Sequence, residues 1–268
     1  MPPAATAASR DRPRGGDLIA AQLYTVRDQL QDPSRLGGVL GRLREIGYEA
    51  VEVAGLGPKT AERFAAERAR AGLTACAMHV SLDSLKGDLA GVAAQCQEWG
   101  CRHVVLPSLP AEYRSEAGYR RFAAEVVELA RGLWPSGLQL SYHNHSFELE
   151  RSGGRTWLET LFAETAAESL QAELDTYWLQ YGGASPAAWI RRLKGRLPVI
   201  HLKDMAVDKD QPIMAEVGEG NLDWVDILSA CREAGTEWLI VEQDECRRDP
   251  LESLAISYRN LAKLTEEG

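Results

Sequence analysis

The sequence predicts an α/β protein that folds as a single-domain (β/α)₈ TIM barrel. Short apolar runs alternate eight times with longer amphipathic segments along the chain. Each step from one parallel strand to the next needs a crossover, which a helix supplies. Eight such units within 268 residues favour closure into a barrel over an open doubly wound sheet. No Gly-x-Gly-x-x-Gly follows the first apolar run, so a dinucleotide-binding open sheet would lack its phosphate turn.

Each predicted strand is a short apolar run, and each predicted helix has apolar residues at helical spacing. In the first helix Leu36, Val39, Leu40 and Leu43 recur at that spacing, and Gly47 ends the helix. The predicted strands span residues 18–24, 50–53, 73–79, 102–106, 138–143, 170–175, 198–202 and 237–241. The predicted helices span residues 33–46, 60–71, 84–99, 116–133, 156–165, 185–193, 223–234 and 250–264. Residues 218–220, Gly-Glu-Gly, come before a helix and are expected to form a loop and cap at the end of a long polar loop.

The composition is that of an ordinary globular protein, with 45% hydrophobic and 26% charged residues. A net charge of −9 and a pI near 5.2 argue against a general binder of nucleic acid or of anionic membranes. No apolar run approaches the length of a membrane span. The five cysteines are scattered without a Cys-x-x-Cys pair, so a reduced, cytoplasmic compartment is expected. Residues 1–16, rich in Pro, Ala, Arg and Gly, are predicted to be a disordered tail before the barrel at 17–268.

Acids and a histidine stand at the ends of the predicted strands in the second half of the chain. Asp175 ends one strand, His201 lies near the end of the next, and Glu242 directly follows the last. Glu148 comes soon after the end of the fifth strand. Because the active site of such a barrel lies at the C-terminal ends of its strands, these four side chains are expected to converge. Two glutamates, an aspartate and a histidine form a mixed oxygen and nitrogen ligand set, suited to Mn²⁺, Mg²⁺, Co²⁺ or Zn²⁺.

Other polar residues fall on the same rim of the predicted barrel. A lone acid at a strand end is more often a solvated residue or a helix cap, so the prediction rests on the whole set. Alternation along a strand sends His143 and His145 to the same side, where each could bind metal, move protons, or merely orient a ligand. Lys203 could hold a substrate oxyanion, although an exposed lysine paired with an acid is the commoner case. The residues predicted to bind substrate are Gln22, Glu52, His79, His143 and Lys203.

Several segments resemble motifs of the sugar phosphate isomerase/epimerase family, within the xylose isomerase-like TIM barrel superfamily. They are YHNHSFE at 142–148, ELDTYW at 173–178, HLKD at 201–204, GEGNLDW at 218–224, VEQD at 241–244 and DPLES at 249–253. The resemblance implies one divalent metal ion bound by Glu, Asp, His and Glu at the barrel mouth, and Asp175, His201 and Glu242 match directly. In the ketose epimerase branch the first glutamate lies within the fifth strand, where this chain has Tyr142 or His143. The nearest carboxylate, Glu148, is therefore assigned as the fourth ligand, with a histidine of the fifth strand as the alternative.

The resemblance implies a metal-dependent isomerase or epimerase of a small sugar, ketose or polyol derivative, acting through an enediolate. Glu148 and Glu242 would bind metal and flank the substrate, and His145 would move the proton. The main alternative is a metal-dependent lyase or dehydratase, of the inosose or 3-keto-glycoside type, which expels a leaving group from the same intermediate.

Two less favoured alternatives are an endonuclease IV-like nuclease and a non-catalytic sugar-binding protein. The nuclease needs more histidine and acid ligands than the chain offers, and the binding protein would not need all four ligands. A small carbohydrate is the expected partner, with no nucleic acid or membrane. The identity of the substrate and the formation of a homo-oligomer are left open.

Overall fold

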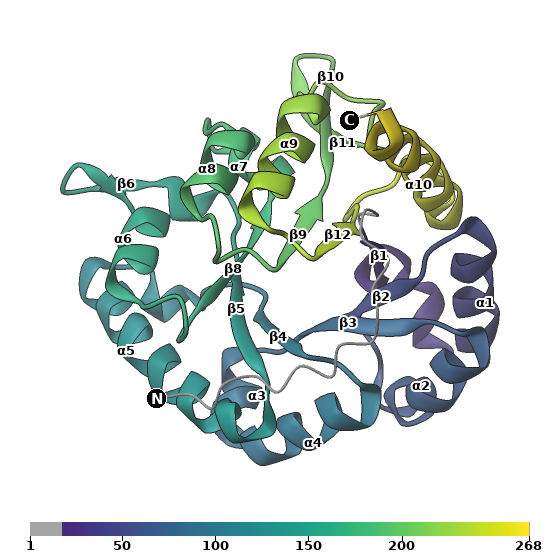
Figure 1. The fold of residues 1–268 in the computed structure, drawn as a ribbon, viewed down its shortest axis with the longest axis horizontal. Helices are drawn as coiled ribbons and strands as arrows, with labels where there is room; N and C mark the ends of the chain where they lie inside the picture. Colours follow the sequence, from purple (N-terminus) through teal and green to yellow (C-terminus); the bar gives the residue numbers. More distant parts are fainter. Residues whose placement is uncertain (1–17, 268) are drawn as a thin grey trace.

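Eight parallel strands close into a barrel in the computed structural model, which describes residues 18–267 (Figure 1). Neighbouring strands around the barrel follow the order β1-β12-β9-β8-β5-β4-β3-β2. The strands are β1 (Leu18–Gln22), β2 (Ala50–Val53), β3 (Thr74–His79), β4 (His103–Leu106), β5 (Gln139–His143), β8 (Gln171–Asp175), β9 (Val199–Leu202) and β12 (Trp238–Val241). The predicted (β/α)₈ barrel is therefore confirmed. The tail predicted at residues 1–16 lies outside the described residues.

Helices surround the barrel on its outside (Figure 1). They are α1 (Leu36–Ile46), α2 (Pro58–Ala71), α3 (Leu82–Gly87), α4 (Leu89–Trp99), α5 (Glu116–Leu133), α6 (Trp157–Glu164), α7 (Thr176–Tyr181), α8 (Pro186–Arg192), α9 (Trp224–Ala234) and α10 (Pro250–Glu267). Short 3₁₀ helices lie at Leu23–Val26, Gln29–Gln31, Ala111–Tyr113, Trp134–Ser136 and Phe147–Leu149. A small two-stranded sheet pairs β6 (Arg151–Ser152) with β7 (Arg155–Thr156).

The helix predicted at 84–99 is in fact two helices, α3 and α4. Asp88 lies between them with φ −150° and ψ 70°, outside the helical region. Its side chain accepts a hydrogen bond from the backbone N–H of Gly91 at 2.8 Å and so caps the start of α4. The aspartate therefore begins a new helix in a stretch whose apolar spacing suggested one continuous helix.

The inside of the barrel changes from apolar to polar along the strand direction. A cluster of buried apolar residues fills the interior and includes Ala20, Ala50, Ala77, Val199 and Ile240. Side chains two residues apart on a strand point to the same side. In five strands the next inward residue after an apolar one is therefore polar, and these residues are Gln22, Glu52, His79, His201 and Glu242. The apolar layer thus supports a polar layer at the C-terminal ends of the strands.

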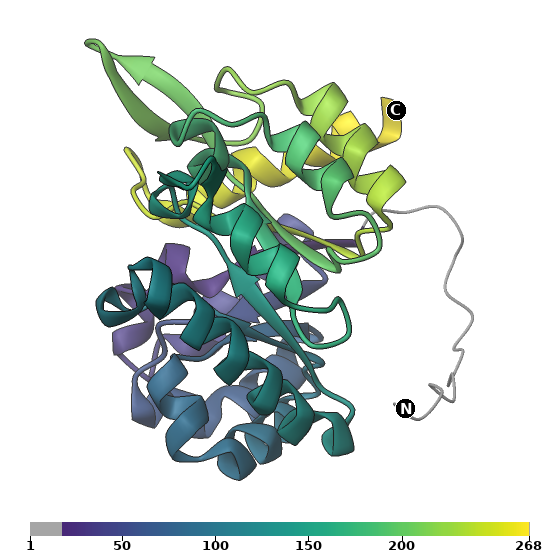
Figure 2. The same ribbon diagram turned by 90° about the vertical axis from the view of Figure 1, so that its left-hand side faces the viewer.

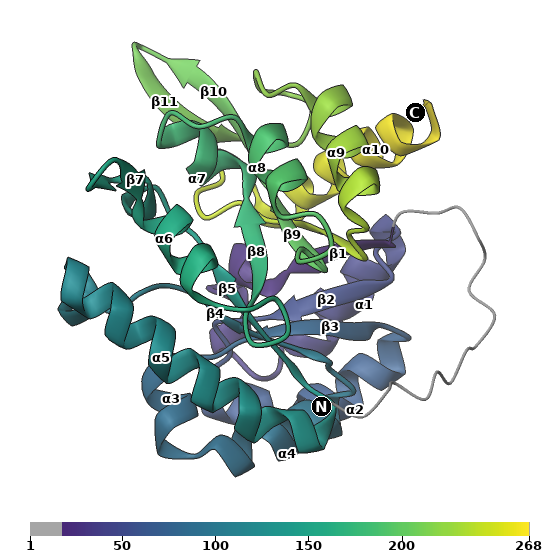
Figure 3. The same cartoon turned by 60° about the vertical axis from the view of Figure 1, so that its left-hand side comes forward.

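The long polar loop predicted after the seventh barrel strand contains a β-hairpin. Its strands are β10 (Asp204–Asp208) and β11 (Gln211–Ala215), which pair antiparallel. Lys209 and Asp210 form the two-residue turn, with φ of 50° and 63°. Hairpin turns of this length commonly need positive φ at both positions, for which Asn-Gly is the usual sequence. Figures 2 and 3 show the hairpin projecting away from the barrel.

Asp204 fastens the loop that follows this hairpin. Its buried carboxylate accepts N–H hydrogen bonds from Gly218 at 2.9 Å, from Gly220 at 3.0 Å and from the Trp224 indole at 2.6 Å. A Cβ on Gly220 would meet Asp204 Oδ1 at 2.3 Å, so only glycine allows this close approach. Asp223 then caps α9 by accepting from the N–H of Asp226. The loop and cap expected at residues 218–220 are confirmed.

Asp204→Ala is expected to lower the free energy of unfolding by about 2–4 kcal/mol, because several buried donors lose their acceptor at once. Urea denaturation measures the change. Asp208→Ala, on the same hairpin, is the control, since the ion pair of Asp208 with Arg247 is exposed and its loss should cost less than about 1 kcal/mol. Equal losses in the two variants would contradict the anchoring role of Asp204.

The five cysteines are all free in the structure. Four of them are buried, and Cys246 is partly buried. None of the helices within residues 18–267 combines the length and apolar character that a membrane span requires.

Candidate metal centre

The C-terminal ends of β8, β9 and β12 bring Asp175, His201 and Glu242 together. Asp175 lies opposite His201 in the β8–β9 pair, and Glu242 directly follows β12, the next strand around the barrel. His143, the last residue of β5, joins them. One ligand atom from each of these four residues lies within 4.8 Å of the others, and all four side chains are buried. We call these four residues the mouth group.

His201 uses its two ring nitrogens differently. Nε2 lies 2.6 Å from Glu52 Oε2, an oxygen that also accepts an N–H from the Gln22 amide at 2.7 Å. Nε2 therefore carries a proton and donates it. Nδ1 faces the other way, 2.9 Å from Glu242 Oε2 and 3.8 Å from Asp175 Oδ2, and has no hydrogen-bond partner. A histidine that binds metal typically donates its second N–H to a carboxylate in this manner.

His143 also directs one ring nitrogen toward a backbone or side-chain acceptor and the other toward Asp175. Its Nδ1 lies 3.1 Å from the carbonyl oxygen of Pro107, which can only accept, so Nδ1 carries the proton. In the neutral ring Nε2 is then a lone pair, and it lies 3.3 Å from Asp175 Oδ2. A lone pair and a carboxylate oxygen repel each other unless a cation or an added proton lies between them. At both histidines of the mouth group, the contact between ring nitrogen and carboxylate oxygen therefore requires a cation or an added proton.

Lys203 supplies part of that positive charge. Its fully buried ammonium lies 3.0 Å from Asp175 Oδ2, and 2.7 Å from both Glu242 Oε2 and Asp244 Oδ2. Burial alone would lower the pKa of Lys203, but these carboxylates raise it well above its usual value. The lysine in turn holds the pKa values of Asp175 and Glu242 well below normal, against the effect of burial. Lys203 is thus paired with acids, which the sequence analysis gave as the commoner case, but its side chain is buried and not exposed.

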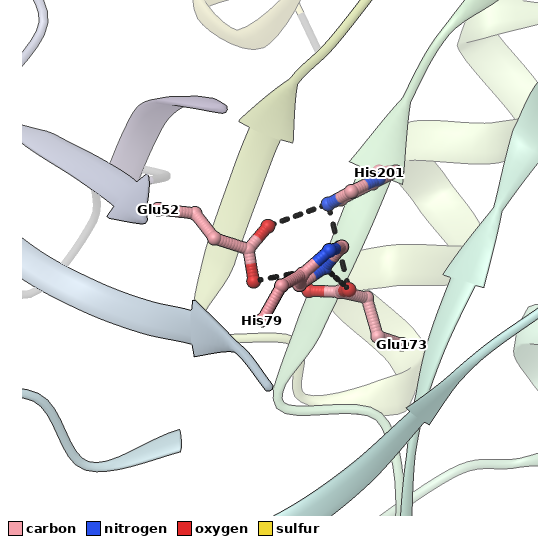
Figure 4. A group of neighbouring side chains, drawn as sticks. All are labelled: Glu52, His79, Glu173 and His201. Carbon is pink, nitrogen blue, oxygen red and sulfur yellow. Dashed lines mark hydrogen bonds and ion pairs between the residues drawn. The ribbon is translucent and has the colours of Figure 1, made fainter. Parts of the chain in front are cut away.

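A second group lies deeper in the barrel and shares His201 with the mouth group (Figure 4). We call Glu52, His79, Glu173 and His201 the inner group. His79 Nε2 lies 2.8 Å from Glu173 Oε2 and 3.4 Å from Glu52 Oε1, and the rings of His79 and His201 stack at 5.4 Å. In Figure 4 the two carboxylates come from different strands and point toward the imidazoles. The inner group therefore holds His201 in place from below.

The two groups together favour positive charge at His201. Burial alone would lower the pKa of this imidazole, but the Glu173, Glu242 and Glu52 carboxylates raise it well above its usual value. Burial would likewise raise the pKa of Glu173, yet the His201 and His79 imidazoles lower it to about 2. With Asp175 included, four buried carboxylates lie in the barrel interior, and Lys203 contacts two of them, Asp175 and Glu242. Buried charges of one sign need compensation, which a divalent cation or protonated imidazoles would supply.

Aromatic rings border the mouth group on the side of α7. Trp178 donates its backbone N–H to Asp175 Oδ1 at 3.0 Å, and its ring lies 5.7 Å from Lys203 Nζ. The ring of His145 lies 5.3 Å from Trp178 and 5.1 Å from His143. His145 Nδ1 is buried without a hydrogen-bond partner, and burial lowers the pKa of His145 to about 3. The imidazole of His145 is therefore neutral at neutral pH and adjoins the mouth group.

Glu148, which the sequence analysis assigned as the fourth metal ligand, belongs to neither group. Its buried carboxylate accepts the Tyr142 hydroxyl at 2.5 Å and the backbone N–H of His145 at 2.9 Å. Burial raises the pKa of Glu148 to about 7. Tyr142 alternates with His143 along β5, so its side chain points out of the barrel, toward the helices. Glu148 follows Tyr142 to that side and holds the turn that carries His145.

The residues predicted to bind substrate have the following positions. Glu52 and His79 belong to the inner group, and Gln22 bonds to Glu52 with its amide N–H while its Oε1 caps the turn at Tyr24. His143 belongs to the mouth group, and Lys203 lies between its acids. The structure thus brings all five to the C-terminal end of the barrel, bound to one another and to the two groups.

The profile of the family described as xylose isomerase-like TIM barrel matches residues 40–264. The chain belongs to this family. The resemblance inferred from the strand-end motifs is therefore confirmed at the level of the family. No match was found among curated proteins.

Solved structures of other xylose isomerase-like proteins share the fold over nearly the whole chain. A sugar phosphate isomerase/epimerase from Parabacteroides distasonis ATCC 8503 is 19% identical, with a TM-score of 0.78 over 92% of this chain and 98% of that one. An L-ribulose 3-epimerase is 16% identical, with a TM-score of 0.71 over 93% and 94%. A xylose isomerase-like TIM barrel protein from Mycobacterium smegmatis, in complex with magnesium, is 15% identical, with a TM-score of 0.70 over 94% and 97%. At these identities the likeness shows a common fold.

Three polar residues of this xylose isomerase-like barrel were not singled out from the sequence. Glu173 lies two residues before Asp175 on β8, and strand alternation could have placed both inside the barrel. Asn144 accepts the backbone N–H of Asp175 through its side-chain oxygen at 3.1 Å. Asp244 pairs with Lys203 from the segment after β12. Neither Asn144 nor Asp244 lies in a barrel strand, so alternation gives no signal for them.

Proposed function

We propose that the protein is a metal-dependent isomerase or epimerase of a small sugar, ketose or polyol derivative, with one divalent ion held by the mouth group. The observation that carries this proposal is that two imidazole nitrogens, His143 Nε2 and His201 Nδ1, face carboxylate oxygens at 3.3 and 2.9 Å, where bound metal would lie between the nitrogen and the oxygen. The surplus of buried carboxylates supports a cation at this point. Two imidazoles and two carboxylates suit Mn²⁺, Mg²⁺, Co²⁺ or Zn²⁺.

The ligand set proposed here takes His143 in place of Glu148. Both oxygens of Glu148 already accept hydrogen bonds, whereas His143 Nε2 has only an acceptor in front of it. When bound, a divalent ion would polarise a substrate carbonyl and a neighbouring hydroxyl and so acidify the C–H bond between them. Lys203 keeps Asp175 and Glu242 deprotonated, as metal ligands must be. His145 is the residue we propose to move the proton, and Trp178 shields the site from water.

A carbohydrate substrate is supported by the proteins that share this fold, among which are a sugar phosphate isomerase/epimerase and an L-ribulose 3-epimerase. The rival lyase reaction begins with the same proton removal and then expels water or a glycosyl oxygen. Incubation in D₂O with ketoses, inososes and 3-keto-glycosides, followed by NMR, separates the two reactions. Deuterium gained at one carbon without loss of water or aglycone supports the isomerase or epimerase. Loss of either group would establish the lyase, and a protein without metal or turnover would overturn both.

The fourth ligand is tested by a pair of variants. His143→Asn is expected to lower the affinity for divalent metal by at least ~10-fold, because it removes a ligand lone pair. Glu148→Gln is expected to leave metal affinity within about 2-fold of the wild type. Elemental analysis after dialysis against graded chelator measures both variants. A larger loss of metal affinity in Glu148→Gln than in His143→Asn would show that Glu148 is the fourth ligand.

A further inference from the structure

A cavity of about 410 Å³ is lined in part by Trp178, next to the mouth group. Tyr177, Trp178 and Tyr181 of α7 form one wall, and residues 211–214 of β11 form another. Residues 245–247, from the segment after β12, complete the lining. The volume falls within the range of small-molecule sites, roughly 300–1,000 Å³. We call this cavity the aromatic pocket.

Trp178 links the aromatic pocket to the mouth group, because it lines the pocket and also contacts Asp175. Its backbone N–H binds Asp175, and its ring lies near both His145 and Lys203. The same ring also lines the aromatic pocket. A ligand with one end at the mouth group and the other in the pocket would therefore pass along a single aromatic side chain.

The walls of the pocket combine aromatic faces with hydrogen-bonding groups. Tyr181 is 51% exposed, and its ring packs against Tyr177 at 5.8 Å and Trp178 at 5.7 Å. Gln211, Glu245 and Arg247 place an amide, a carboxylate and a guanidinium around these rings. Sugar rings have apolar C–H faces and hydroxyl edges, so aromatic faces rimmed by polar groups suit them.

The hairpin that forms one wall is held against the opposite wall. Arg247 forms an ion pair with Asp208 of β10 at 2.5 Å, which links the hairpin to the segment after β12. This exposed pair connects the hairpin, which projects from the barrel (Figure 3), to the segment that forms the facing wall of the pocket.

We propose that the aromatic pocket binds a second sugar ring of the substrate, so that the substrate is a glycoside of at least two rings and not a free monosaccharide. This inference rests on the proposed function, which puts the reacting ring at the mouth group. Trp178 spans the junction of the two rings, and Tyr181 stacks on the outer one. The polar groups of Gln211, Glu245 and Arg247 bind the hydroxyls of the outer ring.

The test compares the binding of four disaccharides, maltose, cellobiose, trehalose and sucrose, with that of D-glucose, by calorimetry and saturation-transfer NMR. At least one disaccharide is expected to bind more tightly than glucose. Tyr181→Ala should lower the affinity for that disaccharide by about 3- to 10-fold, the scale of one lost aromatic contact, and leave the affinity for glucose unchanged. Tyr24→Ala is the matched control, because Tyr24 is also partly exposed but does not line the pocket. Its ratio of disaccharide to glucose affinity should equal that of the wild type.

Three results would overturn the second-ring assignment. The first is that no disaccharide binds more tightly than glucose. The second is that Tyr181→Ala lowers the affinities for glucose and for the disaccharide equally. The third is that 4-nitrophenyl glucoside binds more tightly than all four disaccharides. The measurement needs no turnover, so it also separates this inference from the proposed function. Disaccharide preference in a protein that lacks metal would uphold the pocket and reject the metal centre.

Discussion

Asp175→Asn should lower the affinity for divalent metal by more than ~10²-fold, the upper end of the effect of residues that only support ligands. Asp175 Oδ2 is the oxygen that both imidazoles of the mouth group approach, at 3.3 Å from His143 Nε2 and 3.8 Å from His201 Nδ1. An amide of the same shape has no charge and is a weaker ligand. It would also leave the buried Lys203 ammonium with one counter-charge fewer, which adds repulsion against a cation.

Asp244→Asn is the control for this charge effect. Asp244 also pairs with Lys203, at 2.7 Å, but it belongs to neither group of ligand atoms. It should therefore keep metal affinity within ~10-fold of the wild type. Chelator titration followed by elemental analysis gives both affinities, and thermal melts establish that each variant is folded. Similar losses in the two variants would mean that the net charge around Lys203, and not ligation by Asp175, controls metal binding.

Three of the four residues of the mouth group could be predicted from the sequence to lie close together, because active sites of such barrels lie at the C-terminal ends of the strands. Asp175, His201 and Glu242 stand at or directly after strand ends, and a strand fixes both the direction and the depth of its side chains. Glu148 lies beyond a strand, in a 3₁₀ turn that returns its carboxylate to Tyr142 on the outside of β5. No local pattern indicates the direction of such a turn, so the position of Glu148 outside both groups could not be predicted from the sequence.

The walls of the aromatic pocket were also out of reach of the sequence pattern. The β10–β11 hairpin turns at Lys209 and Asp210, a pair without the glycine that usually marks a two-residue turn. Helix α7 is only six residues long, too short for its apolar spacing to be distinctive. Both elements are held by hydrogen bonds of the folded structure. The Asp175 side chain caps α7, and Asp204 accepts hydrogen bonds from five N–H groups in and after the hairpin. Strand order could therefore be predicted, whereas the loops that shape a substrate site could not.

His145→Asn should lower turnover by ~10²-fold or more while the protein keeps its metal, the usual scale for a positioned acid or base. The Glu148 carboxylate holds the backbone of His145, and Trp178 and His143 pack near its ring, so the imidazole adjoins the mouth group without belonging to it. A neutral imidazole both accepts and donates a proton, which transfer between two substrate atoms requires. Steady-state kinetics on an authenticated substrate, paired with metal analysis, measures the effect.

His143→Asn gives the matched comparison, since the two histidines are separated by one residue and differ in their proposed roles. It should lose metal, and its activity should recover in part when metal is supplied in excess, whereas His145→Asn should not respond to added metal. Loss of metal from His145→Asn would make His145 a ligand. Near-normal turnover in His145→Asn would leave proton transfer to another group, such as the inner-group pair of His79 and Glu173, which are in contact at 2.8 Å.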